Sequence, residues 1–134
     1  MVCQNIEFFT GAGISAESGI PTFRDAKEGL WRKYDPYHLC SASGFHEDPQ
    51  AVLDFYNERR LKLLDVEPNS AHRAIAELEQ YHNITVLTQN VDNLHERAGS
   101  SIVIHLHGEL TKVTSSKNRL DPKCIKKRSR LVSQ

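Results

Sequence analysis

The sequence predicts an α/β fold built on a largely parallel sheet, and three observations support this prediction. Short apolar or β-branched runs alternate along the chain with segments of helical periodicity. Each of these runs ends in a glycine-rich or polar motif. In parallel sheets the functional side chains gather where the strands end, so the three motifs are the candidates for a binding site.

The composition is that of one globular domain. The chain has 134 residues, of which 39% are hydrophobic and 25% are charged, and these proportions exclude a disordered protein. No apolar run has the length of a membrane span, and the start of the chain lacks the basic and apolar regions of a secretory signal. We therefore expect a cytoplasmic protein without a membrane partner.

The first predicted elements are a strand and a long loop. Residues 6–10 form an apolar run that ends at Gly11 and Gly13, as a buried strand entering a glycine turn does. The stretch 21–46 is rich in glycine, proline, serine and aromatic residues, and is expected to be a loop with short helical turns. A loop of this length in a compact domain is usually functional.

Two helices are predicted next. Asp48 can cap the first helix, Pro49 occupies its first position, and apolar side chains then repeat at helical spacing as far as Leu63. Asn69 or Ser70 is expected to open the second helix. The apolar face predicted for this second helix consists of Ala71, Ile75 and Leu78.

The chain continues with two more strands and a short helix. The β-branched run 84–87 predicts a strand, and a helix is expected from about Asp92 to the glycine at 99, a residue that commonly ends helices. Residues 102–104 predict a third strand. The predicted order of elements therefore alternates, as a parallel sheet with crossover helices requires.

The last part of the chain is basic. Residues 117–134 contain seven basic residues and one acid. Lysine and arginine can bind nucleic-acid phosphates, but this segment has neither interleaved aromatic residues nor apolar periodicity. We expect a solvated, disordered tail with no nucleic-acid partner, and a folded domain at residues 1–116.

Residues 11–16, GAGISA, fit a dinucleotide-binding pattern. Its glycines let the backbone approach a pyrophosphate, and the start of the following helix supplies N–H donors. An ordinary dehydrogenase also needs an acidic residue about twenty residues on, at the end of a second strand. Here that region is the loop 22–25, which argues against a dehydrogenase.

Three motifs follow one another along the chain. They are GAGISAESGIPTFR at 11–24 with GLW at 29–31, TQNVDNLH at 88–95, and HLHGEL at 105–110. Together they resemble the motifs of the sirtuins, and more particularly of the bacterial class III type, over residues 6 to about 113. The resemblance implies a Rossmann-like sirtuin catalytic domain that removes acyl groups from lysine with NAD, releasing nicotinamide and an O-acyl-ADP-ribose.

The resemblance also implies roles for single residues. His107 would be the general base that activates a ribose hydroxyl, a task that suits an imidazole near neutral pH. His95 and His105 are expected to be structural. Asp92 would contact the cofactor, although it is also placed to cap the following helix. The predicted cofactor contacts are Gly11, Ala12, Gly13, Ser15, Glu17, Ile20, Pro21, Thr22, Phe23, Arg24, Trp31, Gln89, Asn90, Asp92 and His107.

A pair of residues indicates which acyl groups are removed. Tyr56 and Arg59 are three positions apart, which places both side chains on one face of a helix. A phenol and a guanidinium can together bind a carboxylate. The resemblance implies that this YxxR pair selects succinyl and malonyl groups, and the alternative is a half-buried tyrosine beside an exposed arginine.

The sequence departs from the sirtuin pattern in two ways. The stretch 111–117 lacks the cysteines of the usual zinc module, and Cys3, Cys40 and Cys124 cannot supply four ligands, so neither zinc nor any other metal is expected. A complete sirtuin also has another half-domain, and we expect a frameshifted or prematurely ended chain with exposed apolar strands.

Acylated-lysine proteins are the expected substrates, and the oligomeric state is left open. The alternatives are an inactive fragment that at most binds NAD or ADP-ribose, and a protein ADP-ribosyltransferase.

Overall fold

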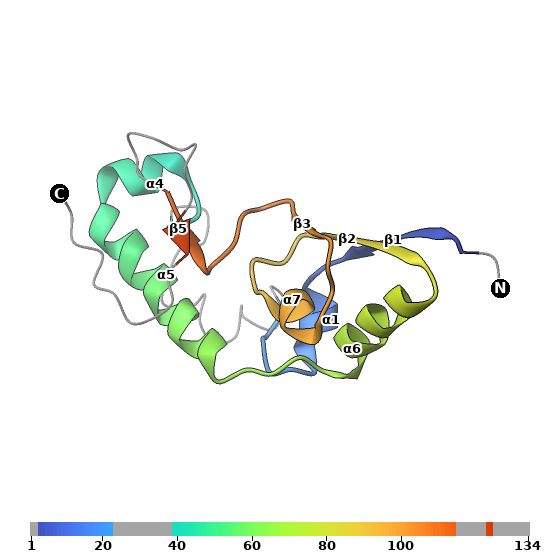
Figure 1. Cartoon of the computed structure of the whole chain (residues 1–134). Helices are drawn as coiled ribbons and strands as arrows, with labels where there is room; N and C mark the ends of the chain where they lie inside the picture. Colours follow the sequence, from blue (N-terminus) through green and yellow to red (C-terminus); the bar gives the residue numbers. More distant parts are fainter. Residues whose placement is uncertain (1–2, 23–38, 115–122, 125–134) are drawn as a thin grey trace. The chain divides into compact units, whose positions relative to one another are not determined.

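The computed structural model describes residues 3–22, 39–114 and 123–124. The chain divides into two compact units. The first unit comprises residues 1–22 and 66–109, and the second comprises residues 23–65 and 110–134. Figure 1 labels most of the helices and strands of both units.

The first unit is a three-stranded parallel sheet with helices between its strands. The sheet has the order β1-β2-β3, with Phe8 opposite Val86 and Leu87 opposite Ile104. Its elements are β1 (Asn5–Thr10), α1 (Ala12–Ala16), α6 (Ser70–Glu77), the 3-10 helix η2 (Leu78–Gln80), β2 (Asn83–Thr88), α7 (Leu94–Ala98) and β3 (Val103–His105). The α/β class and the parallel sheet predicted from the sequence are therefore confirmed.

One face of this sheet forms the apolar core of the first unit. Ile84 and Val86 of β2 are buried, and Ile75 of α6 packs against them. Ile14 of α1 and Phe8 of β1 are partly buried against the same cluster. The alternation of buried residues along β2 places every second side chain in this core.

The opposite face of the sheet is exposed. Phe9 and Ile104 are 65% and 47% exposed, and Leu87 lies between them in register. Parallel sheets are normally covered on both faces, but within the part of the chain that the structure describes this face carries no covering helix. The exposed apolar strand residues expected from the sequence are thus present.

The described residues of the second unit form two helices and a short antiparallel pair of strands. Its elements are α4 (Ala42–Glu47), α5 (Pro49–Leu64), β4 (Lys112–Val113) and β5 (Lys123–Cys124). Asp48 caps α5 as predicted, since its carboxylate accepts a hydrogen bond from the amide of Ala51 at 3.0 Å. Phe55 of α5 packs against Leu39 and Val52, and this cluster is the core of the unit.

Some predicted details differ from the structure. Helix α6 begins at Ser70 with Asn69 as its cap, as expected, but its buried side chains are His72 and Ile75, and Ala71 is exposed. Strand β5 lies inside the segment predicted to be a disordered tail. The remaining residues of that tail, 117–122 and 125–134, lie outside the described residues. No helix in the described part of the chain has the length and apolar composition of a membrane span.

Candidate functional site

Three predicted cofactor residues form one buried hydrogen-bonded set in the first unit. The Ser15 hydroxyl donates to Asp92 Oδ2 at 3.0 Å. The side-chain amide of Asn90 donates to Ser15 Oγ and to the backbone oxygen of Gly11, each at 3.1 Å. All three side chains are buried. These bonds tie the glycine turn after β1 to the loop after β2.

The register of the sheet explains why these two loops meet. Thr10 and Thr88 end β1 and β2 and lie opposite each other. The amide of Gln89 then donates to the backbone oxygen of Thr10 at 3.0 Å, and the amide of Asn90 donates to Thr88 Oγ1 at 3.0 Å. Because the strands are parallel, both loops leave the same edge of the sheet, where the sequence predicted the site.

Of the two roles considered for Asp92 from the sequence, the structure bears on the one at the start of the following helix, and the cofactor contact stays a prediction. Its Oδ1 accepts a hydrogen bond from the amide of Leu94, the first residue of α7, at 3.2 Å, and its Oδ2 accepts from Ser15. Helix α7 therefore begins at Leu94, two residues later than expected. The carboxylate is bound within the protein through both oxygens, so Asp92 holds the glycine turn and the helix start together.

Asn69 is a residue of the site that sequence reasoning identified only as a helix cap. Its Oδ1 accepts from amides at the start of α6, and its Nδ2 donates to the backbone oxygen of Ile14 at 2.7 Å and to Ser18 Oγ at 3.0 Å. The asparagine signals a cap in the sequence, but nothing in a sequence pattern shows the long-range contact with the glycine loop.

Two further histidines lie beneath the site. His95 is buried, and its Nε2 lies 3.0 Å from Thr10 Oγ1. Its ring is 4.8 Å from that of His72, which is also buried. Burial, followed by the neighbouring His72, lowers the pKa of His95 to about 4. These neutral rings are part of the interior, which agrees with the structural role expected for His95.

Other predicted cofactor residues form the accessible edge of the glycine loop. Gly13 is exposed, and a Cβ added there would meet no atom within 4 Å. The amide of Ile20 donates to the backbone oxygen of Ser15 at 3.3 Å, which folds the loop back on α1. Thr22 is partly buried. The exposed members of the predicted set are Ala12, Glu17, Pro21 and Gln89.

His107 follows β3 and is exposed, so its imidazole is open to solvent in the first unit. His105, the last residue of β3, is instead bonded at both ring nitrogens, to the Asn90 backbone oxygen and to Glu96. Glu96 is absent from the sequence prediction, because the contact joins α7 to β3 across the fold.

The remaining predicted residues lie in the second unit or outside the described residues. Phe23, Arg24 and Trp31 lie outside the described residues. Tyr56 and Arg59 lie on α5, in the second unit. Burial, followed by the Cys40 thiol, raises the pKa of Tyr56 to about 12. The Arg59 guanidinium carbon lies 5.4 Å from the centre of the Phe55 ring.

Known proteins match this chain over most of its length. The family model described as Sir2 family matches residues 11–131. An NAD-dependent protein deacylase of Bacteroides thetaiotaomicron is 58% identical over 92% of this chain and 52% of its own length. A deacylase of the same description from Helicobacter pylori is 56% identical over 86% of this chain and 50% of its own.

Solved structures support the same likeness. A crystal structure of a Sir2 homologue in complex with NAD has a TM-score of 0.82 and 43% identity, covering 95% of this chain and 49% of the other. The chain therefore spans about half the length of the relatives that it matches. The family match also runs past residue 116, the predicted end of the folded domain, and that boundary stays a prediction.

Proposed function

Since this chain belongs to the Sir2 family, we propose that it carries the NAD-binding part of a protein-lysine deacylase. The observation that carries the proposal is the buried set formed by Ser15, Asn90 and Asp92 beneath the glycine turn. Relatives that share more than half of the aligned residues are named NAD-dependent protein deacylases. Acylated lysine on proteins is the proposed substrate.

The described residues fit NAD. The open space at Gly13 lets the backbone of the turn approach a pyrophosphate without a side chain between them. Both amide hydrogens of Asn90 bond within the protein, so Oδ1 is the atom that this side chain offers to a ligand. When bound, NAD supplies the ribose carbon that receives the acyl oxygen and the nicotinamide that leaves.

The proposed base is His107. It lies in the turn that follows β3, at the edge of the sheet where the two cofactor loops also begin. Its imidazole would accept a proton from a ribose hydroxyl, which is the work of a general base. His105 is already bonded at both ring nitrogens, so it is not placed to take this proton.

The finer proposal is that Tyr56 and Arg59 select acyl groups that end in a carboxylate. The raised pKa of Tyr56 keeps its phenol protonated at neutral pH, so the hydroxyl can donate to a carboxylate. Arg59 adds a positive charge one helical turn along α5. Succinyl-lysine and malonyl-lysine carry the acyl groups that match these two donors.

A second candidate function is ligand binding without catalysis. The exposed Phe9 and Ile104 show one face of the sheet uncovered within the described residues, and the chain spans about half of its relatives. A chain of this kind would bind NAD or ADP-ribose at most.

ADP-ribose transfer to protein stays an alternative, and the cytoplasmic location stays a prediction. Three cysteines do not fit a four-ligand zinc site, so no step is assigned to zinc.

The experiment that tests the function is mass spectrometry of succinyl-lysine and acetyl-lysine peptides incubated with the chain, with and without NAD. A working deacylase removes the acyl group only when NAD is present. His107→Ala should reduce this reaction by about a hundredfold or more, the usual contribution of a general base. Binding of ADP-ribose without any deacylation would favour the second candidate, and label from NAD on protein would favour ADP-ribose transfer.

Arg59→Met tests the acyl preference. Removing the guanidinium should slow desuccinylation by about tenfold to a hundredfold, since a charge-assisted hydrogen bond contributes about 1.5–3 kcal/mol. Deacetylation should change little, because an acetyl group has no carboxylate. Lys62→Met is the matched control, since Lys62 is an exposed cation of the same helix that pairs with Glu58. Equal losses on both peptides would contradict the proposed role.

A further inference from the structure

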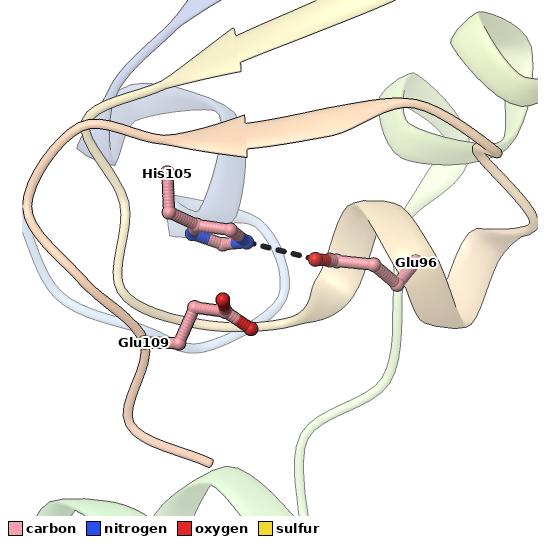
Figure 2. Close-up of side chains that lie close together, drawn as sticks. All are labelled: Glu96, His105 and Glu109. Carbon is pink, nitrogen blue, oxygen red and sulfur yellow. Dashed lines mark hydrogen bonds and ion pairs between the residues drawn. The ribbon is translucent and has the colours of Figure 1, made fainter. Parts of the chain in front are cut away.

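His105 is bonded at both nitrogens of its imidazole ring. Its Nδ1 lies 2.8 Å from the backbone oxygen of Asn90, and its Nε2 lies 2.8 Å from Glu96 Oε1. Figure 2 shows the ring directed at Glu96. A carbonyl and a carboxylate are both acceptors, so each ring nitrogen donates a hydrogen. The ring that makes both bonds is therefore the charged imidazolium.

The charges around the ring favour this form. The hydrogen bond to Glu96 is the main cause that raises the pKa of His105, and the Asn90 carbonyl and the carboxylate of Glu109 act in the same direction. Burial of His105 opposes it. Burial also acts to raise the pKa of Glu96, but its hydrogen bonds with His105 and with a backbone amide outweigh this, and the pKa is lowered.

Asn90 is held by hydrogen bonds at its backbone amide, at its side chain and at its backbone carbonyl. The amide of Asn90 is bonded to Thr88, and its side chain is bonded to Gly11 and Ser15. The imidazolium of His105 fixes the carbonyl, and with it the plane of the peptide that leads toward Asp92. The direction of the whole loop after β2 thus depends on a bond from β3.

We propose that the Glu96–His105 ion pair positions the candidate cofactor site by holding the Asn90 carbonyl. This inference rests on the proposed cofactor role of Asn90. His105 and Glu96 are positioning residues, because they act on the ligand through the backbone of Asn90 and transfer no proton in the reaction. The carboxylate keeps the imidazole charged, and the charged ring keeps the loop in the conformation in which Asn90 reaches Gly11 and Ser15.

The ion pair predicts a coupling that nuclear magnetic resonance can measure on the whole chain. In the unmodified protein, the His105 ring should lose its proton above the ordinary histidine value of about 6.5. The side-chain amide signals of Asn90 should change with the same midpoint. Glu96→Gln keeps an acceptor oxygen but removes the negative charge, so both midpoints should move together to lower pH.

Glu77→Gln is the matched control, because Glu77 is an exposed residue of α6. This change should leave both midpoints where they are. The proposal is overturned if the Asn90 signals do not follow the titration of His105. It is also overturned if Glu96→Gln leaves the His105 midpoint unchanged.

ADP-ribose binding provides the functional readout. Affinity measured by calorimetry should weaken as the pH rises through the His105 midpoint, and Glu96→Gln should weaken it about tenfold or more at neutral pH, as misplaced binding groups do. Equal affinity in the two proteins would contradict the positioning role. If the unmodified chain binds no ADP-ribose at any pH, the proposed function fails, and the Asn90 titration still decides whether the ion pair holds the loop.

Discussion

The interiors of the two units differ in chemical character. Within the described residues, every buried polar or charged side chain belongs to the first unit, and they are Thr10, Ser15, His72, Thr88, Asn90, Asp92, His95 and Ser100. The buried side chains of the second unit are apolar, and they centre on Phe55 of α5. One unit is thus held partly by hydrogen bonds between side chains, and the other by packing.

This difference coincides with the position of the candidate cofactor residues. Burying a polar group costs free energy unless it is hydrogen-bonded, and in this interior Ser15, Asn90 and Asp92 are bonded to one another. Five of these buried polar residues lie at the carboxyl ends of β1 and β2, where the candidate cofactor residues are: Thr10, Ser15, Thr88, Asn90 and Asp92. His72 and His95 lie on α6 and α7. An apolar core is indifferent to pH, whereas one that contains neutral histidines is not. The two units should therefore respond differently to mutation and to acid.

The largest expected effect is that of Phe55→Ala in the second unit. Phe55 is 3% exposed and packs against Leu39 and Val52. Its truncation should lower the free energy of unfolding by about 3–5 kcal/mol, the usual cost of replacing a buried phenylalanine by alanine. Urea unfolding followed by circular dichroism measures this. The loss should be the same at pH 5 and pH 8, because Tyr56, whose ring packs edge-on against that of Phe55, has a pKa raised to about 12.

Phe45→Ala is the control for this prediction. Phe45 belongs to α4 and is 40% exposed, so its truncation should cost much less than that of Phe55. Similar losses for the two variants would mean that the cluster around Phe55 is not a packed core. A loss at Phe55 that depends strongly on pH would remove the distinction between the two interiors.

The acid response of the first unit is the next largest effect. Burial lowers the pKa of His95 to about 4, while an unfolded histidine titrates near 6.5. Between these values the unfolded chain binds a proton that the folded chain excludes, so stability falls as the pH drops from about 6.5 toward 4. The loss from this residue is at most about 3 kcal/mol. Burial lowers the pKa of His72 as well, which adds to the same trend.

His95→Gln should flatten the dependence of unfolding free energy on pH over this range. His46→Gln, at an exposed histidine of α4, is the control and should keep the wild-type slope. The raised pKa of His105 works in the opposite direction, because the stability that it contributes is present at low pH and is lost as the pH rises through its folded pKa. An unchanged slope in His95→Gln would show that this ring is accessible to protons in the folded chain.

Much of the fold could be predicted because it depends on local patterns. The strand at 84–87, the cap at Asp48 and the helix end at Gly99 all follow from periodicity and local backbone chemistry, and the structure confirms them. The buried His72 could not be predicted in this way, because α6 is rotated so that a histidine faces the core in place of Ala71. Its environment depends on His95, which lies on another helix.

The residues of the candidate site could also be predicted from local motifs, but the residues that hold them in place could not. The motifs identified Ser15, Asn90 and Asp92, and the structure joins them. The partners that hold them could not be predicted, since Asn69 bonds to the backbone oxygen of Ile14 and Glu96 bonds to the ring of His105, and no motif records either long-range contact. Sequence patterns identify site residues at strand ends well. They identify poorly the neighbouring residues that hold those site residues in place.

Gly13→Ala has the smallest expected effect on stability, and it tests ligand binding separately from folding. Gly13 lies within α1, and a Cβ there would meet nothing within 4 Å. Alanine is the better helix former, so the variant should be equally stable or more stable by up to about 1 kcal/mol. If the turn approaches a pyrophosphate, the added methyl group should nevertheless weaken ADP-ribose binding.

Gly99→Ala is the contrasting control, because Gly99 has φ of 111° and alanine should cost stability there. Unchanged ADP-ribose affinity in Gly13→Ala would show that the ligand does not touch this part of the turn.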